Sequence, residues 1–104
     1  MLARRWRESL DMLTAHFQHQ LEQARQFLLS QKFTQALSRY ERLAQRCPRE
    51  AVIWFEYGSA ASGLRKRDLA ERAWSRAMEL APRNAELIGL IGRQQKRLGK
   101  FHPA

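Results

Sequence analysis

The histidines and the cysteine are the residues of this chain that could hold a metal ion or act as a nucleophile. His16 and His19 lie three positions apart on an expected helix, so both imidazoles would face one side and could share a metal. The sequence places no third ligand beside them, and we interpret them as a surface pair. Cys47 directly precedes Pro48 at an expected helix end, where a buried small residue is a better interpretation than a reactive thiol.

Other patterns of catalytic chemistry are missing from the sequence. It contains no nucleophile–base motif, no glycine-rich phosphate loop and no paired carboxylates, and His102 stands by itself near the C-terminus. We therefore predict a chain that is not an enzyme on its own and that uses no cofactor and no metal.

Basic residues outnumber acidic ones by 19 to 10, which gives a net charge of +9. The excess is spread along the whole chain instead of forming a tail, and most of the basic residues are arginines. One interpretation is simply an arginine-rich composition. The other is a functional basic surface that meets an acidic protein, a nucleic acid or a membrane.

The totals fit one small domain in the cytoplasm. The chain has 104 residues, of which 44% are hydrophobic and 28% charged, as in an ordinary globular protein. Its single cysteine permits no internal disulfide. No apolar run approaches the roughly 20 residues that a membrane-spanning helix needs. Glu8 and Asp11 interrupt any apolar region of a signal peptide.

Five helices are expected to position these residues. Between Leu2 and Leu28, apolar residues recur in steps of three and four, which predicts one long helix with a possible break near Thr14. Asp68 and Glu71 form a capping-box pattern, Asn84 is a candidate N-cap, and Gly99 is expected to end the last helix in a left-handed conformation. The predicted helices span about 2–30, 34–47, 49–63, 68–80 and 85–98.

A spacing of 34 residues relates three parts of the chain, 17–50, 51–84 and 85–104, and residues 1–16 form an N-terminal extension of the first part. Small residues recur in one column, lysines recur in another, Tyr40 corresponds to Trp74, and the prolines correspond as well. These columns are Ala24, Gly58 and Gly92; Lys32, Lys66 and Lys100; Ala36, Ala70 and Ala104; and Pro48 and Pro82. Self-similarity at this period predicts a solenoid of stacked helix pairs.

The second unit resembles the tetratricopeptide repeat through Trp54, Gly58, Ala61, Ala70, Trp74, Ala77 and Pro82. The first unit matches less fully, with Gln20 in place of the expected Trp and Leu43 in place of a small residue. The third matches at Ile88, Gly92, Gln95 and Ala104. The resemblance implies an all-α solenoid of antiparallel helix pairs, with about five helices and a long N-terminal one. The small residues would let the second helix of each pair approach the first.

The same pattern assigns the bulky aromatic residues mainly to the core, namely Trp6, Phe17, Phe27, Tyr40, Trp54, Tyr57 and Trp74. The third unit stops at Ala104, where its second helix would begin. Two interpretations follow: the chain is a fragment of a longer array, or the helix over 85–98 is a natural polar cap.

In the tetratricopeptide family the first helix of each pair lines a concave groove that binds extended or helical peptides. The corresponding groove positions of this chain are Leu21, Arg25, Leu28, Phe55, Glu56, Ser59, Leu90, Arg93, Lys96 and Arg97. Leu21 and Phe55 would anchor an apolar side chain, and Arg25 and Arg93 would meet acidic groups. The alternative is a solvated face on which Arg25, Glu56 and Arg93 pair with one another.

One subfamily grips the C-terminal carboxylate of heat-shock chaperones through Lys, Asn, Asn, Lys and Arg. The corresponding residues of this chain are Leu21, Arg25, Glu56, Glu86 and Leu90. Because that clamp is missing, we do not expect a heat-shock co-chaperone.

The N-terminal extension carries a further apolar stripe, Leu2, Trp6, Leu10 and Leu13. An exposed stripe of this kind needs a cover. It would either fold back on its neighbours or pair with a second copy of the chain, which makes a homodimer an alternative.

The leading prediction is a non-catalytic scaffold or adaptor that binds a peptide or helix of another protein, with an acidic segment as one option. The alternatives are a small secretion chaperone for an export substrate and an accessory repeat domain of a larger protein, such as a glycosyl- or sulfotransferase. A nucleic-acid binder would use Arg65, Lys66 and Arg67 together with Arg49 and Arg83. We consider it the weakest candidate, because no aromatic residue is interleaved with these charges.

Overall fold

The regular structure is helical throughout the part of the chain that is described. A computed structural model describes the backbone of residues 2–100 and the side chains of residues 15–99. Its helices are α1 (Leu2–Leu29), α2 (Phe33–Arg46), α3 (Ala51–Gly63), α4 (Arg67–Leu80) and α5 (Ala85–Lys100). The predicted all-α class with five helices is therefore confirmed. In the described residues, none of the helices combines the length and the apolar character needed to cross a membrane.

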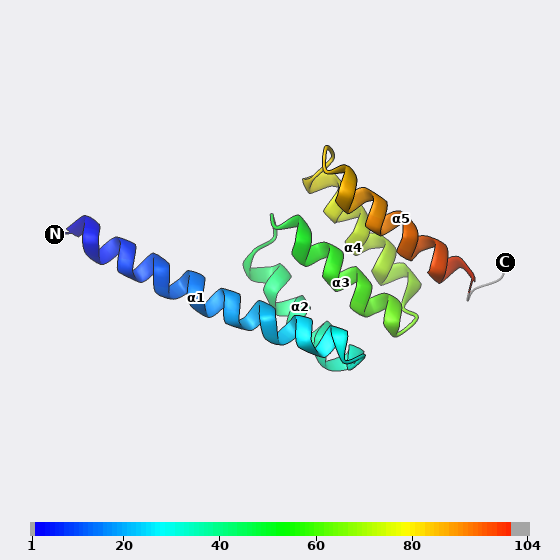
Figure 1. Cartoon of the computed structure of the whole chain (residues 1–104), viewed down its shortest axis with the longest axis horizontal. Helices are drawn as coiled ribbons and strands as arrows, with labels where there is room; N and C mark the ends of the chain where they lie inside the picture. The colour runs from blue at the N-terminus through cyan, green and yellow to red at the C-terminus, as the bar shows by residue number, and fades with distance from the viewer. Residues whose placement is uncertain (1, 101–104) are drawn as a thin grey trace.

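Helix α3 is the central element of the fold. It contacts each of the other four helices, whereas α1 also contacts α2, and α4 also contacts α5 (Figure 1). Two clusters of buried residues lie on either side of it. Leu21, Ala36 and Tyr40 belong to the first cluster, and Trp74 and Ile91 belong to the second. Both clusters include residues of α3, so this helix joins the two halves of the core.

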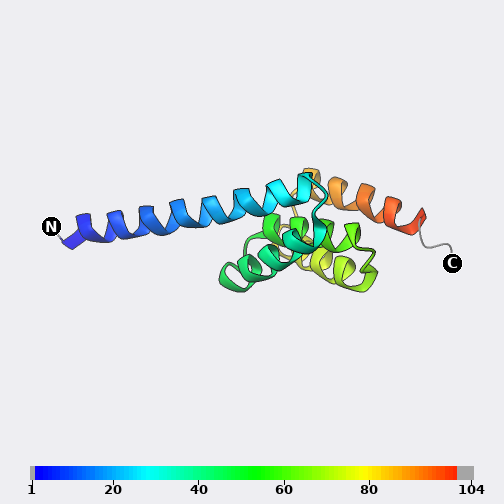
Figure 2. The same ribbon diagram turned by 90° about the horizontal axis from the view of Figure 1, so that it is seen from below.

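Helix α1 is unbroken, as one of the sequence interpretations predicts, and its N-terminal part extends beyond the other helices (Figures 1 and 2). With 28 residues it is about 42 Å long, whereas the 14 residues of α2 span only about 21 Å. Helix α2 is therefore long enough to pack along only about half of α1. The predicted self-association stripe lies outside the described side chains; its residues are Leu2, Trp6, Leu10 and Leu13. The predicted core role of Trp6 lies outside them for the same reason.

The ends of α1 and α3 repeat one another at the 34-residue spacing. Gln31 and Arg65 both adopt left-handed backbone conformations, with φ of 61° and 59°. After α1, the Lys32 N–H donates to the Phe27 carbonyl (2.8 Å) and the Gln31 N–H to that of Leu28 (3.1 Å). After α3, Lys66 and Arg65 donate to Ala61 and Ser62 (2.9 Å each). Both ends are Schellman motifs, so the two helix–turn–helix units have the same turn.

The helix pair α3–α4 packs closely at Gly58. A Cβ atom built on Gly58 would overlap the indole of Trp74, which has no exposed surface, and the Trp74 Nε1–H donates to the Phe55 carbonyl of α3 (3.2 Å). The predicted close approach at this small residue is confirmed. The same prediction is wrong at Gly92, because a Cβ built there meets no atom within 4 Å apart from its chain neighbours and the backbone of α5 itself. No helix of the described residues packs against α5 at that point.

The predicted helix ends are partly right. Asn84 caps α5, since its Oδ1 accepts a hydrogen bond from the Leu87 N–H (3.0 Å). The capping box at Asp68 is wrong: α4 begins one residue earlier with Lys66 as its N-cap, and Asp68 lies in the first turn. The left-handed Gly99 is also wrong, because α5 continues through it to Lys100 and no described glycine has a positive φ.

We predict opposite effects of the same substitution at Gly58 and Gly92. Gly58→Ala forces the Trp74 indole away from α3, so the free energy of unfolding should fall by about 1–3 kcal/mol. Gly92→Ala meets open space and removes a helical glycine, so it should raise that free energy by about 0.5–1 kcal/mol. Urea denaturation followed by circular dichroism measures both variants. Equal changes at the two positions would show that the contact with Trp74 does not govern packing.

We also predict that Gln31→Gly stabilises the protein. A non-glycine residue in the left-handed conformation carries a steric cost that glycine avoids, so the gain should be about 0.5–1 kcal/mol. The control is Gln35→Gly, an exposed position inside α2, which should lose about 1 kcal/mol. Thermal denaturation compares the three proteins. A loss of stability in both variants would contradict the role of Gln31 as a left-handed helix end.

Candidate protein-binding groove

A hollow of about 370 Å³ lies between the three odd-numbered helices. Its volume falls in the range of roughly 300–1,000 Å³ that is usual for ligand pockets. The residues that line it are Leu28 of α1, Phe55, Glu56, Ser59 and Ser62 of α3, and Gln94 and Arg97 of α5. Three helices that are distant in sequence therefore contribute to one concave surface, which we call the groove.

The Glu56 carboxylate ties three helices together beside the groove. Its Oε1 accepts a hydrogen bond from Arg25 Nε of α1 (2.7 Å), within an ion pair of the two side chains. Its Oε2 accepts a hydrogen bond from the Tyr40 hydroxyl of α2 (3.0 Å). The Glu56 side chain is 14% exposed and that of Arg25 41%. Charge-assisted bonds at a shielded carboxylate are stronger than those at an open surface. The negative charge of Glu56 is thus already compensated by the chain itself.

Burial changes the ionisation of Tyr40. Desolvation raises the pKa of the Tyr40 phenol well above its ordinary value, and the charge of Glu56 and the hydrogen bond to it act in the same direction. Arg25 opposes them with a smaller effect. The phenol therefore stays a hydrogen-bond donor to Glu56 over the whole neutral range.

The α5 side of the groove carries uncompensated positive charge. Arg97 lines the hollow and is exposed, and Arg93 and Lys96 are exposed on the same helix. Among the described side chains none of the three forms an ion pair. Beside them, the Ser59 hydroxyl donates to Gln94 Oε1 (2.7 Å), which connects α3 with α5. Glu56 is the acidic residue among those that line the hollow, and it is already paired, so an acidic group would find cations here.

The groove contains five of the ten residues predicted for it: Leu28, Phe55, Glu56, Ser59 and Arg97. Arg25 adjoins it through Glu56. Leu21 lies in the core with 6% exposure, so it offers almost no surface to a partner. Leu90 is half-buried, and neither it nor Arg93 nor Lys96 lines the hollow.

The alternative prediction was a solvated face on which Arg25, Glu56 and Arg93 pair with one another. It is right for Arg25 and Glu56, which form an ion pair, and wrong for Arg93, which does not join them. Gln94 was missed as a groove residue. Its position on α5 corresponds to Ala60 on α3, which is fully buried, so the repeat pattern gives no signal for it. The hollow lies between α3 and α5, and the edge of α5 that adjoins α3 therefore lines it.

The candidate chemical residues are brought together only in part. His16 and Cys47 line one open hollow of about 480 Å³ together with Glu50, whereas His19 does not line it. His16 and His19 are both exposed, and the described side chains contain no group of three or more His, Cys, Asp or Glu that could hold a metal ion. Cys47 is a free, half-buried thiol at the end of α2, next to the first core cluster. Among the described side chains no hydrogen bond joins Cys47 to His16 or Glu50, so this hollow shows no thiol paired with a base.

Comparisons with family models, with curated proteins and with solved structures found no match.

We predict that Tyr40→Phe changes how stability depends on pH. At neutral pH the variant loses the bond to Glu56, which should cost about 1–2 kcal/mol. The folded pKa of Tyr40 is raised, so its contribution is fully present below the unfolded pKa of 10.0 and is lost as the pH rises above that value. Each pH unit above about 10 should remove up to about 1.4 kcal/mol from the wild type.

Urea denaturation of both proteins between about pH 8 and pH 11 measures this effect. The stability gap should narrow by about 1 kcal/mol at the alkaline end. Tyr57 is present in both proteins, so its own alkaline titration cancels in the comparison. Curves that stay parallel would contradict a buried, neutral Tyr40.

Proposed function

We propose that this chain is a non-catalytic protein-interaction module of the tetratricopeptide type. It binds an acidic peptide or helix of another protein in the groove between α1, α3 and α5. The partner's apolar side chain packs on Phe55, and its carboxylates meet the cations of α5.

The observation that carries this proposal is the separation of charge in the groove. Glu56 is neutralised by Arg25 at 2.7 Å, whereas Arg97 on the opposite wall is exposed. Around an apolar floor at Phe55, the free charge is therefore positive. Charge complementarity of this kind selects partners and accelerates their association.

The repeat pattern supports the same proposal. The turns after α1 and α3 have matching geometry at the 34-residue spacing, and Gly58 receives Trp74 as the repeat motif requires. An adaptor, a secretion chaperone and an accessory domain of a larger protein would all use this groove. They differ in the partner, and the adaptor is the form that we propose for a cytoplasmic chain.

The test is capture of a partner from an extract of the source cells with the tagged protein. Arg97→Glu removes the cation that lines the groove, and Phe55→Ala/Arg97→Glu removes the apolar contact as well. Each should reduce the amount of the captured protein by about tenfold or more. Arg97 is exposed, so the single variant should keep its helicity by circular dichroism.

The matched controls are Arg83→Glu and Ile88→Ala/Arg83→Glu. They change an arginine and a large apolar residue at exposed positions that do not line the groove. Both controls should capture the partner as the wild type does. Capture that is unaffected by Arg97→Glu and by the double variant, with helicity intact, would refute binding in the groove.

A further inference from the structure

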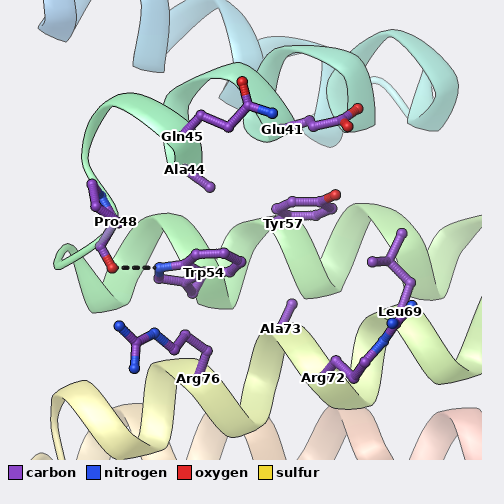
Figure 3. Close-up of a pocket in the computed structure, with 10 residues that line it drawn as sticks. All are labelled: Glu41, Ala44, Gln45, Pro48, Trp54, Tyr57, Leu69, Arg72, Ala73 and Arg76. Carbon is purple, nitrogen blue, oxygen red and sulfur yellow. Dashed lines mark hydrogen bonds between the residues drawn. The ribbon is translucent and has the colours of Figure 1, made fainter.

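A second hollow, of about 560 Å³, lies on the other face of α3, between α2 and α4 (Figure 3). Successive helical residues are about 100° apart, which places Trp54 and Tyr57 roughly opposite Phe55 and Ser59 around α3. The two aromatic residues form the floor of this hollow, and α2 and α4 form its walls. It is therefore separate from the groove.

The aromatic floor is held in place by the chain itself. The rings of Trp54 and Tyr57 are stacked, with centroids 5.9 Å apart and planes 6° apart. The Trp54 indole N–H donates to the Pro48 carbonyl (2.8 Å), which fixes the outer ring (Figure 3). Leu69 and Ala73 of α4 extend the apolar surface. A ligand would meet a preformed surface and would lose little affinity to ordering it.

The charges around this floor are unequal. Arg72 and Arg76 stand one turn apart on the α4 wall, whereas Glu41 is the acidic residue of the α2 wall. Arg76 has an exposed partner in Glu79 at 3.3 Å, a contact of little strength. Among the described side chains Arg72 forms no ion pair.

Two of these charged residues, Glu41 and Arg72, change the pKa of the Tyr57 phenol. Its pKa is raised first by burial, then by Glu41, and is lowered by Arg72. Glu41 and Arg72 therefore both act at the edge of the floor.

We propose that this hollow is a second peptide site, which takes an aromatic side chain flanked by carboxylates. From Leu69 to Arg76 the α4 wall is about 10 Å long, which is the length of about three extended residues. The central aromatic side chain packs on Trp54 and Tyr57. The flanking carboxylates turn toward Arg72 and Arg76 and away from Glu41.

The probe is the peptide acetyl-Ser-Glu-Phe-Glu-Ser-amide, titrated into the ¹⁵N-labelled full chain. The indole N–H signal of Trp54, assigned with Trp54→Phe, should shift and saturate, whereas that of the fully buried Trp74 should not. Peptides with Lys in place of Glu, or with Ala in place of Phe, should bind about tenfold more weakly or not at all. Phenylacetate tests a free aromatic acid as the occupant.

Arg72→Glu/Arg76→Glu should weaken binding of the probe by about tenfold or more, and Glu41→Gln should strengthen it by about twofold. The matched control, Lys66→Glu/Arg83→Glu, changes the net charge equally at exposed positions outside the hollow and should leave the affinity unchanged. The groove variant Phe55→Ala/Arg97→Glu should also bind the probe normally, which separates this site from the proposed function.

Several results would overturn the proposal. They are the lack of a saturable Trp54 shift, equal binding of the Lys or Ala peptide, and loss of binding in the groove variant. Binding of phenylacetate as tight as that of the peptide would also overturn it.

Discussion

The packing of Trp74 against Gly58 is the contact on which the remaining architecture depends. The indole fills the space that a side chain at Gly58 would occupy, and its N–H donates to the Phe55 carbonyl at 3.2 Å. This holds α4 on α3 and places Arg72, two residues earlier on α4, beside the aromatic floor. The same bond fixes the backbone from which the Phe55 side chain reaches the groove. One small residue therefore positions parts of both hollows.

Tyr40 occupies the position in the first helix pair that Trp74 occupies in the second. It also donates a hydrogen bond to α3, but to a side chain instead of a backbone carbonyl. Its hydroxyl donates to Glu56, next to the residue that accepts from Trp74. Helix α3 is thus held by one aromatic residue from α2 and one from α4, each through a polar atom. Glu56 needs the Tyr40 bond because it is largely shielded from water and would otherwise depend on the half-exposed Arg25 alone.

The sequence pattern correctly predicted the features that follow from the repeat within one unit. It missed features that depend on contacts between neighbouring units. The helices, the role of Gly58 and the cap at Asn84 follow from local spacing and were predicted correctly. The capping box failed because its signal, Asp followed by Glu, does not fix the first helical residue, and Glu71 instead accepts a bond from Gln95 of α5. Gly99 failed because glycine permits a left-handed end without requiring one.

In the groove, packing between units decided which predicted residues are available. Leu21 became part of the core, and the orientation of α5 brought Gln94 and Arg97 to the hollow in place of Leu90 and Arg93. Trp54 and Tyr57 had been assigned mainly to the core. That assignment holds for Tyr57, whereas Trp54 is half-buried and keeps surface in the second hollow.

Helix α3 has an unusual composition, which bears on both proposed sites. Its sequence, AVIWFEYGSAASG, contains one charged residue, Glu56, and a helix that is apolar on all sides belongs in an interior. It forms the floor of both hollows, through Phe55 and Ser59 on one face and through Trp54 and Tyr57 on the other. Since the one charge of α3 is already paired, a ligand of either proposed site would be selected by the charges of the flanking helices, by Arg97 of α5 or by Arg72 of α4.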